Sequence, residues 1–258
     1  MASRILTRPA IRRGSILEFF GNDPTIKLAV SLDGNVRDES RNGNHGTLVG
    51  GMSYGVGKIG LAGRFDGIDD RVNLGTAALT TGATTVMYFY RHFDALVESY
   101  FTFDLKIGRA TGMIGLSLGI WQGFLHRGAG GIWVFANSGS IVTVQWHHVA
   151  MVYDGVDPAA LSSHKICVDG QPNVVTSDAP QGIGWSANTI GSDSALIACY
   201  KGWINNFGVF SRGLSLAEIS QYCQWATATP RKYWFYSPTV AGVYMDSYFY
   251  RHLMAGGR

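Results

Sequence analysis

The sequence predicts an all-β protein built as a sandwich of two antiparallel sheets. The 258 residues include 34 glycines and only 15% are charged, which is typical of a compact, turn-rich globule rather than a helical or disordered chain. Short apolar runs alternate with polar turn residues over most of the chain. The length fits one large sandwich with a complete core, since such domains reach about 200–250 residues.

The chain divides into a basic N-terminal arm over residues 1–25, a sandwich over residues 26–229 and an aromatic C-terminal tail over residues 230–258. We expect both terminal arms to be extended. The first thirteen residues carry four arginines and no acid, so the net charge of +3 leaves +3 − 4 = −1 for residues 14–258. No apolar run in the arm is long enough for a signal peptide or a membrane span.

Each strand is predicted from a short apolar run bounded by turn residues. The run at 147–153 is apolar on both faces, which predicts a strand between two layers, with Trp146 beside it in the core. The dipeptide Asp169-Gly170 predicts a hairpin turn. The expected strands cover residues 26–32, 47–49, 84–92, 100–107, 113–118, 131–136, 147–153, 165–168 and 203–210.

One short C-terminal helix is predicted to begin at Ser215. Ser215 and Glu218 have the spacing of a capping box, and Leu214 and Ile219 occupy the positions of a hydrophobic staple. The helix should end before Thr229, because a following proline disfavours the helical conformation.

Two passages carry a resemblance to a known family. The first runs from Asp38 to Leu74 and contains a glycine-punctuated hairpin, and the second runs from Trp146 to Gly170 and begins with Trp-His-His-Val-Ala. In this order they resemble the laminin G-like, concanavalin A-like lectin/glucanase superfamily. The resemblance implies a jelly-roll sandwich over residues 26 to 225. That fold hosts lectins, glycosidases, adhesion modules and viral structural proteins, so it does not specify an activity.

We expect no enzymatic activity. Retaining glycosidases of this fold place paired carboxylates on one strand, but none of the four glutamates here has a second glutamate within a strand's reach. His147 and His148 are neighbours on a strand and point to opposite faces, so they cannot chelate one ion together, and packing accounts for His148.

Carbohydrate and calcium are the ligands that the sequence leaves open. Tryptophans near glycine-rich turns are candidate platforms for sugar rings, namely Trp121, Trp133 and Trp185. We predict no cofactor, with calcium as the alternative, because loop oxygens can hold that ion. Each loop residue could instead stabilise its own turn. The calcium candidates are Asp38, Asn42, Asp69, Asp70 and Asp193.

The odd number of cysteines suits a reducing cytoplasm, with one disulfide and one free thiol as the alternative.

The terminal segments suggest assembly. The tail contains five tyrosines, two phenylalanines and one tryptophan, which would not stay in water. The capped helix followed by a Pro-Arg-Lys-aromatic segment also resembles proteins of tailed bacteriophages. The first hypothesis is therefore a non-catalytic structural or adhesion subunit of a bacteriophage virion, in capsid decoration or a tail fibre, assembled in the host cytoplasm. The alternative is a free carbohydrate-binding lectin module.

The expected partners are other virion proteins, further copies of this chain and a host-surface glycan. A few arginines without a basic body are a weak footprint for nucleic acid, and charged residues and a proline in the tail argue against a membrane span. The expected assembly contacts are Arg4, Arg8, Arg12, Arg13, Trp234, Phe235, Tyr248 and Tyr250.

Overall fold

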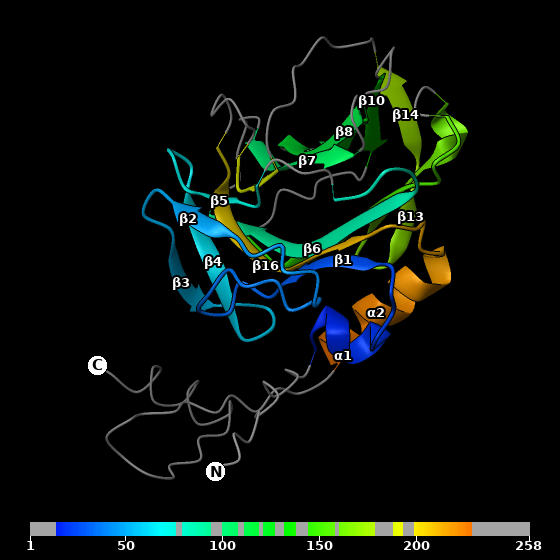
Figure 1. The fold of residues 1–258 in the computed structure, drawn as a ribbon. Helices are drawn as coiled ribbons and strands as arrows, with labels where there is room; N and C mark the ends of the chain where they lie inside the picture. Colours follow the sequence, from blue (N-terminus) through cyan, green and yellow to red (C-terminus); the bar gives the residue numbers. More distant parts are fainter. Residues whose placement is uncertain are drawn as a thin grey trace, which may run out of the picture.

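The protein is described by a computed structural model in which two eight-stranded antiparallel sheets pack face to face (Figure 1). This architecture confirms the predicted sandwich. Two helices lie against the outer face of one sheet, and neither is long and apolar enough to cross a membrane. The structure describes residues 14–75, 79–93, 100–107, 111–118, 121–126, 132–137, 144–157, 160–178, 188–192 and 199–228.

The first sheet has the strand order β13-β12-β11-β6-β16-β4-β3, and β1 pairs with the second half of β16. Its strands are β1 (Ile26–Val30), β3 (Ser53–Val56), β4 (Leu61–Asp66), β6 (Thr84–His92), β11 (His147–Tyr153), β12 (His164–Val168), β13 (Gln171–Asn173) and β16 (Lys201–Phe210).

The second sheet has the order β14-β10-β9-β8-β7-β15-β5-β2. Each strand that the sequence predicted is present, with bounds that differ by at most two residues. The strands of this sheet are β2 (Thr47–Val49), β5 (Arg71–Asn73), β7 (Tyr100–Ile107), β8 (Thr111–Leu118), β9 (Trp121–His126), β10 (Ile132–Asn137), β14 (Val175–Asp178) and β15 (Thr189–Ile190).

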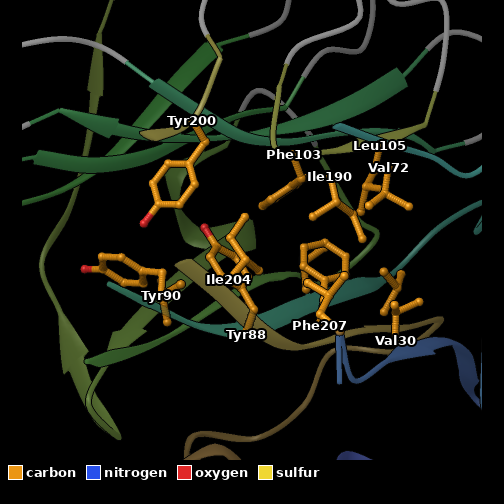
Figure 2. Packing of buried hydrophobic residues seen from close by; sticks show 14 of the residues in the cluster. Val30, Val72, Tyr88, Tyr90, Phe103, Leu105, Ile190, Tyr200, Ile204 and Phe207 are labelled. Carbon is orange, nitrogen blue, oxygen red and sulfur yellow. The ribbon is translucent and has the colours of Figure 1, made fainter. Parts of the chain in front are cut away.

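The main core fills the space between the sheets, where side chains from both point toward one another (Figure 2). Tyr88 and Phe207 of the first sheet stack at 5.4 Å between ring centroids, and Phe103 of the second sheet packs against both. The hydroxyls of Tyr88 and Thr102 lie 2.6 Å apart, so one buried hydrogen bond links the layers. Burial raises the pKa of Tyr88.

A second core lies on the outer face of the first sheet, beneath α1 (Ile16–Phe20) and α2 (Leu216–Ala228). Strand β11 contributes Val149 to the first core and Ala150 to the second, which confirms that it lies between two layers. Trp146 is half-buried against the second core and precedes the strand, so its predicted full burial is wrong.

The predicted capping box and turn are both present. The amide of Glu218 donates to Oγ of Ser215 at 3.2 Å, and the amide of Ser215 donates to Glu218 at 2.8 Å. Helix α2 ends at Ala228, before the proline, as predicted. Asp169 and Gly170 have φ values of 51° and 78° and connect β12 to β13, as a type I′ hairpin requires. The three cysteines are buried, free thiols.

The prediction of an extended arm through residue 25 is wrong, because residues 16–20 form α1. Ser15 caps this helix by accepting a hydrogen bond from the amide of Glu18. Ile16 is 1% exposed and packs on Gly208 of β16. A Cβ added to Gly208 would lie only 2.2 Å from Cδ1 of Ile16. Asp23, in the following turn, forms an ion pair with Arg212 at 2.9 Å. Residues 14–25 therefore belong to the folded body.

Candidate functional site

The predicted sugar platforms do not define a site in the described part of the chain. Trp121 lies on β9 and Trp133 on the neighbouring β10, but their side chains, and the whole of Trp185, are outside the described residues. The predicted assembly contacts also lie outside them, namely Arg4, Arg8, Arg12, Arg13, Trp234, Phe235, Tyr248 and Tyr250. A candidate site must therefore be built from other residues.

Trp203 on β16 is half-buried on the outer face of the first sheet. Side chains alternate along a strand, and its neighbour Ile204 enters the core between the sheets, so Trp203 points the opposite way. Helix α1 packs on Gly208, farther along the same strand. In Figure 1, β3 and β4 lie at the end of the sheet away from α2. The outer face beside β4 is therefore distinct from the face beneath the helices.

The indole of Trp203 reaches across β4 to β3. A Cβ added to Gly55 of β3 would lie 2.4 Å from Cη2 of Trp203, so only glycine leaves room for the ring in this position. Phe93, which follows β6, meets the indole edge to face with the ring centroids 5.7 Å apart. The ring is thus fixed on two sides while part of it stays exposed.

Two arginines flank Trp203 in the sheet. Trp203 pairs with Arg64 on β4 and with Arg91 on β6, so the three side chains stand side by side on one face. The guanidinium of Arg64 lies 4.8 Å from the ring centroid of Phe93, which is a cation–π contact. Arg91 has a buried Nε without a hydrogen-bond partner. Among the described residues, neither arginine forms an ion pair.

We refer to Gly55, Arg64, Arg91, Phe93 and Trp203 as the tryptophan–arginine face. The sequence prediction placed Trp203 only at the start of a strand and did not recognise this surface. The signal that could have found it is the alternation of side chains along a strand. Trp203 stands between Gly202 and Ile204, which are both buried, and therefore points to the opposite face.

Three carboxylates gather at the turn between β4 and β5. Oxygen atoms of Asp66, Asp69 and Asp70 lie within 4.8 Å of one another. Asp70 is buried and accepts hydrogen bonds from the amides of Gly51 and Asp66 at 2.6 and 3.0 Å. Burial, together with the charges of Asp66 and Asp69, raises the pKa of Asp70. This arrangement matches the oxygen chemistry of calcium, which stays the alternative to the predicted absence of a cofactor.

The other calcium candidates have turn-forming roles. Asp38 is buried, and its carboxylate accepts from the amides of Ala29, Ser40 and Asn44. The side-chain amide of Asn42 donates to the carbonyl of Ile26 at 2.7 Å. The bonds of Asp38 to Ser40 and Asn44 are the local function that the sequence offered as the alternative, whereas the bond of Asn42 ties this turn to β1. Asp193 lies outside the described residues.

The two neighbouring histidines point to opposite faces of β11, as predicted. His147 Nδ1 lies 2.7 Å from Oδ2 of Asp169. Burial alone would raise the pKa of Asp169. The hydrogen bonds from His147 and from the amide of His148 outweigh the effect of burial, so the pKa of Asp169 is lowered. His148 is 1% exposed among Phe89 and Tyr222, and this burial lowers its pKa to about 4. Packing therefore accounts for His148.

A model of laminin G-like domains, described as the Concanavalin A-like lectin/glucanases superfamily, matches residues 65–220. The chain belongs to this superfamily. The match covers more than half of the sequence and contains the whole of the second passage, together with residues 65–74 at the end of the first. A search of curated proteins finds no match.

Solved structures of the superfamily fold include sugar-bound and receptor-binding domains. Domain 4 of AbnA, a GH43 extracellular arabinanase from Geobacillus stearothermophilus in complex with arabinotriose, has a TM-score of 0.59 and 17% identity, over 78% of this chain and 98% of that one. The receptor binding domain of botulinum neurotoxin D has a TM-score of 0.53 and 12% identity, over 79% of this chain and 53% of that one.

The binding domain of botulinum neurotoxin DC in complex with SialylT has a TM-score of 0.56 and 14% identity, over 83% of this chain and 54% of that one. This chain therefore spans about half the length of the toxin domains. At these identities, the likeness shows the fold alone.

Proposed function

We propose that this protein is a carbohydrate-binding module, and that the tryptophan–arginine face is its sugar-binding surface. The observation that carries the proposal is Trp203, a partly exposed indole held by Gly55 and Phe93 on a fold shared with sugar-bound domains. The C–H face of a pyranose can stack on an indole, while the guanidinium groups of Arg64 and Arg91 donate hydrogen bonds to sugar oxygens. Rigid aromatic anchors with a few polar donors are typical of binding sites.

Replacing Trp203 by alanine is expected to weaken glycan binding by about tenfold or more, because the stacking surface is lost. The measurement is a glycan-array screen of the protein, followed by calorimetric titration with the best ligand. Trp146→Ala is the matched control, since Trp146 is also half-buried but packs against the second core. Equal loss in both variants, with the fold retained by circular dichroism, would refute the assignment.

We propose further that the module does not hydrolyse its ligand. The support is the residue inventory, because the paired glutamates of retaining glycosidases are missing from the sequence. The sugars recovered from the binding experiments should therefore be intact.

A second proposal concerns where the module works, as a structural or adhesion subunit of a bacteriophage virion. Its support is the composition of the two ends, since residues 1–13 carry four arginines and residues 230–258 carry eight aromatic side chains. The folded body begins before α1, so the expected assembly segments are 1–13 and 230–258 rather than 1–25.

Deleting residues 230–258 is expected to leave a folded, soluble sandwich that no longer joins particles, because the aromatic tail would contact neighbouring subunits. Mass spectrometry of purified particles measures the incorporation of each form. Full-length protein that is missing from the particles, or truncated protein present at the same copy number, would rule out this role.

A further inference from the structure

We infer that the tryptophan–arginine face selects glycans that carry carboxylate groups, an inference that rests on the proposed carbohydrate-binding function. A neutral sugar can accept hydrogen bonds from the two guanidinium groups, but it carries no negative charge to pair with them. Arg64 and Arg91 flank Trp203 through the strand register, which places a cation on each side of the stacking surface.

The arginines have unused binding capacity. Arg64 contacts Phe93 through its cation but forms no ion pair within the described chain, and Arg91 likewise has no described acid as a partner. The Nε of Arg91 is buried without an acceptor, which is an unfavourable state for a charged donor. A carboxylate is the planar anion that a guanidinium binds best, through two parallel hydrogen bonds. An acid group on the ligand would therefore supply an acceptor that the described part of the chain does not offer.

The surrounding charges favour an isolated carboxylate over a long polyanion. Two residues beyond Arg64 on the same strand, Asp66 begins the acidic cluster that also contains Asp69 and Asp70. A phosphate backbone that extended from Arg64 along β4 would meet these three acids. Residues 14–258 also carry a net charge of −1, which gives no general attraction for nucleic acid. The chemistry thus points to an oligosaccharide with a single acid group, such as one terminal uronic acid or sialic acid.

The test uses ligand pairs that differ only in charge. A disaccharide with one galacturonic acid is compared with its methyl ester, and sialyllactose with lactose, by calorimetric titration against the full-length protein. Within at least one pair, the acidic member is expected to bind about tenfold more tightly than its neutral partner, and added salt should reduce the difference. Arg64→Gln and Arg91→Gln should each weaken binding of the acidic member more than binding of the neutral member, so that the preference falls. Lys27→Gln is the matched charge control, because Lys27 lies on β1, which pairs with the half of β16 away from Trp203.

The outcomes separate this inference from the proposed function. If neutral and acidic sugars bind equally, and Trp203→Ala abolishes both, the charge selection is wrong and the carbohydrate-binding function stands. If no sugar of either pair binds, the inference and the assignment of this face both fail. Single-stranded DNA that binds as tightly as the acidic sugar, with the same dependence on the two arginines, would overturn the inference in favour of nucleic acid.

Discussion

Replacing Asn205 by alanine is expected to lower the free energy of unfolding by about 4 kcal/mol. Asn205 is fully buried on β16, at the point where β4 stops pairing with this strand and β1 has not yet begun. Its Oδ1 accepts from the amide of Ile59 at 2.7 Å, and its Nδ2 lies 2.7–3.0 Å from the carbonyls of Ser31, Ile59 and Leu61. One side chain thus bridges a gap that backbone hydrogen bonds leave open.

The expected loss is large because alanine leaves several buried backbone groups without partners. An amide nitrogen has two hydrogens, so Nδ2 serves two of the three carbonyls at a time, and the truncation removes about three hydrogen bonds. Asn205→Asp should be at least as damaging, since a carboxylate would face three carbonyl oxygens.

Asn35→Ala is the matched control, with an expected cost below about 1 kcal/mol, because Asn35 is half-buried and bonds only within its own turn. Urea titration of the four proteins measures the effect, and an equal cost for the two alanine variants would contradict the bridging role.

The strands that the sequence predicted well are those whose pattern is local. Strands β6, β7 and β11 have the predicted bounds, because each is a continuous apolar run between turn residues. Helix α1 was missed since five residues are too few to display a helical period, and its stability comes from the packing of Ile16 on Gly208. The two residues of β15 are likewise too few to show an alternation.

The candidate site could not be predicted because it depends on strand order. Arg64, Arg91 and Trp203 belong to β4, β6 and β16, and nothing in the local sequence shows that β16 lies between the other two. The position of the Trp203 ring also depends on Gly55, because the missing Cβ of this glycine leaves room for the indole over β3. The sequence instead favoured tryptophans beside glycine-rich turns, a pattern that carries no information about the sheet face on which a ring lies.

Mild acid is expected to destabilise the fold through His148. This histidine lies on β11 beneath α2, where Phe89 and Tyr222 surround its ring and neither ring nitrogen has a hydrogen-bond partner. Two of the titratable groups nearby are Asp169, at the β12–β13 turn, and its partner His147 on β11. The other two are the thiols of Cys167 and Cys223, and burial raises the pKa of each thiol to about 11. Only Asp169 favours the protonated ring, and burial outweighs it, so the pKa of His148 falls to about 4.

Because the folded pKa of about 4 lies below the ordinary value near 6.5, the unfolded chain binds a proton between these pH values that the folded protein does not. The stability is complete above about pH 6.5 and falls as the pH is lowered, with an expected loss of about 2 kcal/mol between about pH 7.5 and about pH 5. His148→Phe keeps an aromatic ring against Phe89 and Tyr222 but cannot be protonated, so its stability should change less over this range. The loss that remains belongs to His164, whose pKa is also lowered by burial. Urea titrations of both proteins at the two pH values give the difference directly. Parallel losses in the wild type and the variant would place the acid sensitivity elsewhere, since the lowered pKa of Asp169 acts only under more acidic conditions.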